Sequence, residues 1–292
     1  MEDIRDNNNL KIAIPNKGRL LEPSLKLLED TGLIFQKNDR SLISPCQNFD
    51  LDIVYIRAGD IPEYVQDNVV DLGITGSDLI LEKGVKVEKL INLGFGKSTL
   101  VVAVPYNNKI KKLSDLKNKK IATTYISTAK EFLKKNSIKA EIIEIEGATE
   151  ITTRLSLSDA IIDVVSSGTT LRMNNLKKLV DILDSEAVLI GNKKHIAPIK
   201  RDRMGKLVTI IDSVVNARNK RYIMMNVPEE KLEKIKKVAP GLSSPTVMKL
   251  VKKGMIAVHS VVNEKDVWEI INKLKKIGAT GILVMPIEKI TF

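Results

Sequence analysis

Asp159-Ala-Ile-Ile-Asp-Val-Val-Ser-Ser-Gly-Thr-Thr-Leu171 is a short apolar run of strand type, followed by small polar residues and a segment that can form a helix from Leu171. A loop between a strand and a helix points several backbone N–H groups and hydroxyls into one small volume, which suits a phosphate. Gly168 lets the backbone approach a ligand or adopt a positive φ. We therefore expect a phosphate to be bound by Ser166, Ser167, Gly168, Thr169 and Thr170.

Two acidic residues accompany this loop. Asp163 lies inside the apolar run, where its burial is costly unless it has a partner, and a sugar diol or a Mg²⁺ ion would supply one. Together with Asp159 it favours a site for ribose 5-phosphate, and the loop resembles the phosphoribosyl-diphosphate loop of phosphoribosyltransferases. The alternative is an ordinary capped helix after a strand, with Asp163 in a structural hydrogen bond.

Length and composition limit the class of protein. The 292 residues allow two or three domains, and a hydrophobic content of 43% with 28% charged residues is typical of a globular protein. No apolar run approaches the roughly 18 residues that a membrane span needs. A single cysteine, Cys46, and a polar stretch over residues 1–9 without a signal-peptide core lead us to expect a cytoplasmic protein.

The net charge of +11 is concentrated near the C-terminus. Residues 218–292 hold 15 Lys and Arg against 7 Asp and Glu, so they carry +8 of the total. Many of these lysines lie at helical positions between apolar residues and indicate a solvated face. Only Tyr222, Trp268 and Phe292 are aromatic there, which leaves few side chains for stacking on bases. We therefore expect neither nucleic acid nor a membrane as a partner.

Three strands in the N-terminal third each run into a polar turn. Residues 10–15 precede Lys17 and Arg19, residues 51–56 precede Arg57, and residues 71–75 precede Gly76 and Asp78. Ligands of open α/β sheets bind at the carboxyl ends of strands. The three turns are therefore expected to line one crevice.

A second α/β unit follows, with strands expected at residues 100–104, 120–124, 141–145 and 160–165. Residues 179–190 return the chain to the first unit, and residues 200–218 form a helix. This order resembles the type II periplasmic-binding-protein architecture. The expected lobes are residues 1–98 with 190–217, and residues 99–189.

The pattern changes after residue 217. Strands at 222–227, 245–250, 255–262 and 281–286 and helices at 228–238 and 264–277 give the order β-α-β-β-α-β of a ferredoxin-like domain, residues 218–292. Val267, Ile270, Ile271, Leu274 and Ile277 form the apolar stripe of its second helix, and Trp268 is assigned to packing. His259 alternates with apolar neighbours and is assigned a structural role. With His195 as the only other histidine, a histidine-based metal site is excluded.

Several segments resemble the ATP phosphoribosyltransferase family in its long form. They are Ile14-Pro-Asn-Lys-Gly-Arg-Leu20, Asp71-Leu-Gly-Ile-Thr-Gly-Ser-Asp78, Leu93-Gly-Phe-Gly96, residues 150–171, Ile182-Leu-Asp-Ser185 and residues 278–289. The chain departs from the family pattern at Ser156 and Asn68, where glycine is common. Asn tolerates the left-handed backbone region well.

The resemblance implies the first reaction of histidine biosynthesis. N1 of ATP displaces diphosphate from C1 of phosphoribosyl diphosphate, assisted by Mg²⁺, and phosphoribosyl-ATP forms. Lys17, Arg19 and Arg57 are the implied catalytic cations. Gly18, Gly76 and Asp78 would contact the nucleotide, the loop and Asp163 would hold phosphoribosyl diphosphate, and Asp159 and Glu146 are weaker candidates for ribose or metal contacts.

The resemblance also implies that residues 218–292 are an ACT-like regulatory domain for histidine as feedback inhibitor. Its expected contacts are Asn226, Leu242, Ser243, Thr246 and Gly281. The long form implies a homohexamer, with a dimer when the inhibitor is absent. Alternatives that remain open are a two-lobed sensor without catalysis, a basic nucleic-acid regulator and a different phosphoribosyltransferase.

Overall fold

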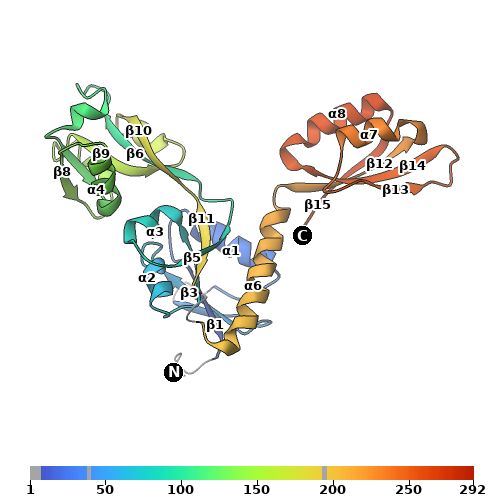
Figure 1. Ribbon diagram of the computed structural model, residues 1–292, viewed down its shortest axis with the longest axis horizontal. Coiled ribbons are helices and arrows are strands. Elements are labelled where there is room, and N and C mark those ends of the chain that lie inside the picture. The colour runs from blue at the N-terminus through green and yellow to red at the C-terminus, as the bar shows by residue number, and fades with distance from the viewer. Residues whose placement is uncertain (1–7, 38–40, 193–195) are drawn as a thin grey trace. The chain divides into compact units, whose positions relative to one another are not determined.

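The computed structural model describes residues 8–37, 41–192 and 196–292 (Figure 1). The chain divides into two compact units, Met1–Lys206 and Leu207–Phe292. Most of the N-terminal polar stretch, residues 1–7, and His195 lie outside the described residues. Among the helices described, none is long and apolar enough to cross a membrane.

The first sheet of the N-terminal unit contains six strands in the order β2-β3-β1-β4-β11-β5. Its central strands β3, β1 and β4 are parallel, and β11 runs antiparallel between β4 and β5. Helices α1, α2 and α3 belong to this lobe. The bounds are β1 Leu10–Pro15, α1 Leu21–Asp30, β2 Ile43–Pro45, β3 Leu51–Ile56, α2 Ile61–Gln66, β4 Leu72–Gly76, α3 Ser77–Lys83, β5 Glu88–Asn92 and β11 Ala187–Gly191.

The second sheet contains five strands in the order β10-β6-β9-β7-β8. Strands β9, β7 and β8 are parallel, whereas β6 runs antiparallel to both β9 and β10. The bounds are β6 Ser98–Pro105, η1 Leu113–Leu116, β7 Lys120–Thr123, α4 Ile126–Lys135, β8 Glu141–Glu144, η2 Thr149–Ile151, β9 Ala160–Val165, α5 Thr169–Met173 and β10 Leu176–Ser185. The predicted strands of this lobe are confirmed.

The chain crosses between the two sheets twice, from β5 to β6 and from β10 to β11. The crossing segments are hydrogen-bonded to each other: Leu93 N donates to Ala187 O and Ala187 N donates to Phe95 O, both at 2.9 Å. Two sheets joined by two adjacent crossings confirm the predicted two-lobed architecture.

The C-terminal unit has the predicted β-α-β-β-α-β order. Its sheet runs β13-β14-β12-β15, so β13 and β15 are the edges. The bounds are β12 Lys220–Pro228, η3 Glu229–Lys231, α7 Leu232–Val238, β13 Thr246–Lys249, β14 Met255–Asn263, η4 Glu264–Asp266, α8 Val267–Ile277 and β15 Thr280–Pro286. Helix α6, Pro198–Ala217, contains the boundary between the two units.

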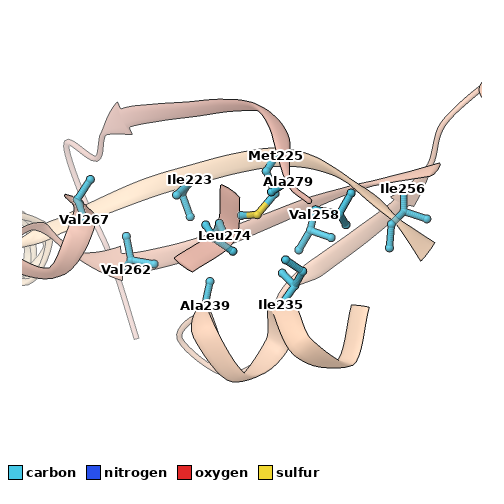
Figure 2. Packing of buried hydrophobic residues seen from close by; sticks show 11 residues of the cluster. Ile223, Met225, Ile235, Ala239, Ile256, Val258, Val262, Val267, Leu274 and Ala279 are labelled. Carbon is cyan, nitrogen blue, oxygen red and sulfur yellow. The ribbon is translucent and has the colours of Figure 1, made fainter. Parts of the chain in front are cut away.

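One face of this sheet packs against α7 and α8 (Figure 2). Alternate residues of β12, Ile223, Met225 and Val227, are fully buried together with Leu274 of α8. The predicted helix stripe packs on this core. The packing role assigned to Trp268 is wrong, because this residue is 78% exposed.

Two further sequence expectations concern single residues. His259 is structural: its Nδ1 lies 2.6 Å from the hydroxyl oxygen of Tyr222, and the two rings meet edge to face. Asn68 and Ser156, which replace common glycines, adopt φ values of +59° and +57°. Both positions therefore keep the left-handed backbone that glycine normally provides.

We predict that Leu274→Ala destabilises the C-terminal unit by about 2–5 kcal/mol, because it leaves a cavity in a fully buried cluster. Trp268→Ala on the same helix is the matched control and should change stability by less than about 0.5 kcal/mol. Urea denaturation of the full chain measures both. Equal effects of the two substitutions would contradict the description of this core.

Candidate functional site

The carboxyl ends of β3, β1 and β4 lie at one edge of the first sheet, because these neighbouring strands are parallel. The turns that follow them are tied together. Asn16 N donates to Ile56 O at 2.8 Å, and the buried Thr75 hydroxyl donates to Ala58 O at 2.8 Å. The three turns singled out in the sequence are therefore neighbours at this edge.

The first two turns supply exposed cations. Lys17 and Arg19 are exposed, and Gly18 between them has a φ of +82°. Arg57 is also exposed, in the turn after β3. Arg19 reaches the other lobe, since its Nη2 donates to Ser98 Oγ at 2.9 Å.

Asn16, beside these cations, was missed in the sequence. Within the described residues, its Oδ1 is the buried side-chain polar atom that has no hydrogen-bond partner. A buried acceptor without a donor costs about 1–3 kcal/mol. A ligand that carries a hydroxyl or amino group could supply that donor.

The loop that is expected to bind phosphate, residues 166–170, lies at the carboxyl end of β9 and is called the phosphate-type loop below. Ser166, Ser167, Thr169 and Thr170 are exposed, and Gly168 has a φ of +71°. The Ser167 hydroxyl donates to Thr169 Oγ1 at 3.0 Å and accepts from Thr169 N at 3.4 Å. The loop thus presents several hydroxyls to solvent in a small volume.

Asp159 lies at the other end of β9 and is not brought to this loop. Its carboxylate accepts from Lys120 N at 2.9 Å, and Lys119 Nζ is 3.8 Å away. A six-residue strand separates it from the loop by roughly 20 Å. The carboxylate holds the start of β7, a structural role that explains an acidic residue at this position.

The carboxyl edges of the two sheets face each other. Tyr125, between β7 and α4 in the second lobe, donates a hydrogen bond from its hydroxyl to Asp78 Oδ2 of the first lobe at 2.6 Å. Ser185 Oγ donates to Asp78 Oδ1 at 2.5 Å and accepts from Asp78 N at 3.1 Å. Burial and the Asp78 carboxylate raise the pKa of Tyr125, so its phenol stays protonated and donates.

Gly76 and Asp78 are placed differently from the sequence expectation. Asp78 is only 2% exposed and both its carboxylate oxygens accept hydrogen bonds from protein groups. A Cβ on Gly76 would collide with the Asp78 carboxylate. Glycine here makes room for an inter-lobe contact, and Asp78 is engaged in that contact.

Asp163 lies on β9 where the lobes meet. Its Oδ1 accepts from Val164 N at 2.7 Å. Burial and the negative charge of Glu150 raise the pKa of Asp163 to about 6, against the opposing effects of the Val164 N–H bond and the Arg19 guanidinium. A cation from one lobe and a carboxylate from the other therefore lie close enough to affect each other.

The described residues contain no group of three or more His, Cys, Asp or Glu that could hold a metal ion. Glu146 is exposed after β8, two strands from the phosphate-type loop. Glu150 is the acidic residue whose charge acts on Asp163, and sequence reasoning missed its role. Mg²⁺ commonly binds one or two carboxylates together with substrate phosphates, so this donor set fits a metal that arrives with a phosphorylated ligand.

A cavity of about 510 Å³ lies along the crossing segments. Both lobes line it, and its residues are Ser77, Lys89, Asn92, Lys97, Ser98, Thr99, Ser166, Asp184, Ser185 and Glu186. The cavity therefore extends from Ser166 of the phosphate-type loop to Ser98, the partner of Arg19.

Cys46 does not line this cavity. Burial and, to a smaller extent, the charge of Asp52 raise the pKa of its thiol to about 11, which makes it a poor nucleophile.

The five predicted effector residues form two groups. Asn226 and Gly281 are adjacent, since a Cβ on Gly281 would lie 3.3 Å from Asn226 Nδ2. Leu242, Ser243 and Thr246 are exposed at the start of β13. Asn226 lies on β12 and Gly281 on the edge strand β15, whereas the second group lies at the other edge strand, β13, which is two strands or about 10 Å from β12.

Comparisons with known proteins agree over most of the chain. Residues 57–213 match the family model described as "ATP phosphoribosyltransferase", and residues 217–289 match the one described as "HisG, C-terminal domain". Proteins named ATP phosphoribosyltransferase from Methanosarcina barkeri and Bacteroides thetaiotaomicron are 44% and 43% identical to this chain. In each case the match covers 96% of this chain and 99% of the relative.

A solved structure supports the same grouping. The ATP phosphoribosyl transferase (HisG:HisZ) complex from Thermotoga maritima matches with a TM-score of 0.62 and 28% identity. The match covers 71% of this chain and 98% of that chain.

We predict that Asp163→Asn raises the thermal stability of the protein at pH 8 and leaves it nearly unchanged at pH 4. The pKa of Asp163 is above its ordinary value, so the stability it contributes when protonated is lost as the pH rises through about 6. Removing the charge should then recover about 1–2 kcal/mol, or several degrees in Tm. Thermal unfolding from pH 4 to 8 measures this, and a pH-independent difference would contradict it.

Proposed function

The chain belongs to the ATP phosphoribosyltransferase family, and we propose that the crevice between the carboxyl edges of its two sheets is where ATP and phosphoribosyl diphosphate meet. The enzyme transfers the phosphoribosyl group to N1 of ATP, the first step of histidine biosynthesis. The observation that carries the proposed location is the Tyr125–Asp78 hydrogen bond, which makes the two edges face each other.

Each lobe has a part in this reaction. Ser166, Ser167, Gly168, Thr169 and Thr170 hold the 5′-phosphate. Asp163 accepts hydrogen bonds from the ribose hydroxyls, which requires its carboxylate form, and Arg19 favours that form. A second carboxylate, Glu150, lies near enough to act on Asp163.

Lys17, Arg19 and Arg57 act on the diphosphate. N1 of adenine donates its lone pair to C1 of the ribose while the C1–O bond breaks, and that electron pair leaves with the diphosphate. Cations placed around the leaving group stabilise its developing charge, and the approach of two polyanions needs them as well. No protein nucleophile is required, because orientation and charge stabilisation carry the reaction.

Magnesium fits this arrangement as an ion carried by phosphoribosyl diphosphate. We expect Asp163 to share it, with Glu150, whose charge acts on Asp163, as the second carboxylate. Bound there, Mg²⁺ would neutralise charge on the diphosphate. Asn16 Oδ1 would accept from a hydroxyl or amino group of a substrate.

The C-terminal unit binds histidine as feedback inhibitor in this proposal. Its two groups of candidate contacts lie on separate strands, Asn226 and Gly281 on β12 and β15 and the other group at β13, about 10 Å from β12. A second chain that contributes one of these groups would complete the site. This geometry supports a homo-oligomer, which we propose to be a hexamer with histidine and a dimer without it, in the cytoplasm.

We predict that Arg57→Ala lowers kcat/KM for phosphoribosyl diphosphate about 10- to 100-fold, the equivalent of one lost charged hydrogen bond to phosphate. Lys117→Ala, a cation removed at an exposed position of the second lobe, is the control and should have little effect. The ultraviolet absorbance change of adenine on N1 ribosylation measures the rate with ATP, phosphoribosyl diphosphate and Mg²⁺. No reaction of the parent protein, with pyrophosphatase present, would reject the proposed activity.

We also predict that Asn226→Ala raises the histidine concentration needed for half-inhibition by at least about tenfold, since the proposed hydrogen bond from its side-chain amide to histidine is lost. Trp268→Ala, exposed on the helix face of the same unit, should respond to histidine as the parent does. Inhibition curves from the same absorbance assay provide the measurement. Unchanged inhibition of Asn226→Ala would remove this residue from the effector site.

A further inference from the structure

Glu82 lies on α3 of the first lobe but makes its hydrogen bonds to the second lobe. Its Oε1 accepts from Ser127 N at 2.8 Å. Its Oε2 accepts from Thr128 N at 2.9 Å and from Thr128 Oγ1 at 2.8 Å. Both carboxylate oxygens therefore cap the first turn of α4.

Helix α4 depends on this contact for its cap. Its N-cap residue, Tyr125, gives no side-chain cap, and its first turn contains no acidic residue. A carboxylate at a helix N-terminus satisfies free N–H groups and interacts favourably with the helix dipole. Helix α4 of the second lobe therefore receives its N-terminal cap from a residue of the first lobe, whereas most helices are capped by a residue next to them in the sequence.

Glu82 is also placed unfavourably for its own helix. It lies in the last turn of α3, where the dipole disfavours a negative charge. A residue that is unfavourable for its own helix indicates that it stabilises another contact. Here that contact is the one with α4.

Helix α3 is fixed to the crossing segments at its other end. Ser77 N donates to Glu186 O at 3.0 Å, and Ser77 Oγ donates to Ser185 Oγ at 3.2 Å. Asp78 and Glu82, four residues apart, lie on the same side of α3 and both contact the start of α4. The helix therefore extends from the hinge to the second lobe.

Two adjacent crossing segments leave one rotation free, as a hinge does. Contacts of α3 with the start of α4, made by Glu82 and by Asp78 with Tyr125, remove that freedom. We propose that Glu82 is a positioning residue: by capping α4 across the lobe boundary, it sets the angle between the lobes and so the distance over which the phosphoribosyl group is transferred. This role rests on the proposed function, because one lobe holds the cations and the other holds the ribose phosphate.

The test is Glu82→Gln, in which the amide nitrogen faces N–H donors and cannot accept from them. We expect kcat to fall about tenfold or more, because the reacting atoms must be held about 3–3.5 Å apart. KM for both substrates should stay within about threefold, since neither binding surface changes. Glu63→Gln is the matched control. Glu63, on α2, pairs at 2.9 Å with Lys83 of α3, the helix that carries Glu82, so this ion pair lies within the first lobe.

A second readout needs no activity. Spin labels at Val69→Cys, 55% exposed in the first lobe, and at Lys135→Cys, exposed at the end of α4, report the inter-lobe distance in a Cys46→Ser background. We expect Glu82→Gln to broaden the distance distribution and Glu63→Gln to leave it as in the parent.

Three results would overturn the role of Glu82. They are an unchanged distance distribution, an unchanged kcat in a folded variant, and a loss confined to Tm. An inactive parent would reject the proposed function, and the distance measurement would still decide the role of Glu82.

Discussion

The pairing of the two crossing segments is the constraint on which the rest of the N-terminal unit depends. Leu93 and Ala187 are far apart in sequence, yet their backbones are hydrogen-bonded where the lobes join. This pairing brings β11 into the first sheet between β4 and β5. It also fixes Ser98 and Ser185, one on each crossing, as partners for Arg19 and Asp78.

Polar side chains cross the lobe boundary in both directions at this junction. Arg19 reaches from the first lobe toward Ser98 and Asp163, and Tyr125 reaches from the second toward Asp78. A buried carboxylate is costly unless hydrogen bonds satisfy it, and Asp78 obtains these from both the hinge and the second lobe. Asp163 is less well satisfied, which is consistent with its raised pKa and with a role that waits for a ligand.

Much of this arrangement could be predicted from residues that are neighbours in the sequence. Strand-turn-helix patterns located the turns after β1, β3, β4 and β9, because each pattern is local and its consequence at a parallel sheet edge is general. The β-α-β-β-α-β order of the C-terminal unit was equally readable. The exposure of Trp268 was not predicted. Successive residues of a helix point in different directions, so a residue next to the apolar stripe can lie in the core or in solvent.

The parts that sequence reasoning missed are contacts between distant residues. Nothing near Glu82 indicates that its carboxylate caps a helix more than 40 residues away. Asp78 follows a strand as a ligand contact would, and only the fold brings Tyr125 and Ser185 to it. Asp159 precedes the apolar run and Asp163 lies within it, so the length of β9 decides that only one of them is near the loop.

The position of β11 has a consequence for the order in which the protein forms during synthesis. Strand β5 is bonded within its sheet only to β11, which leaves the ribosome about 100 residues later. Every strand of the second lobe has emerged by then. The lobe that comes second in the chain can therefore close first, while β4 remains an open edge and β5 an unpaired strand that a chaperone or another chain could bind.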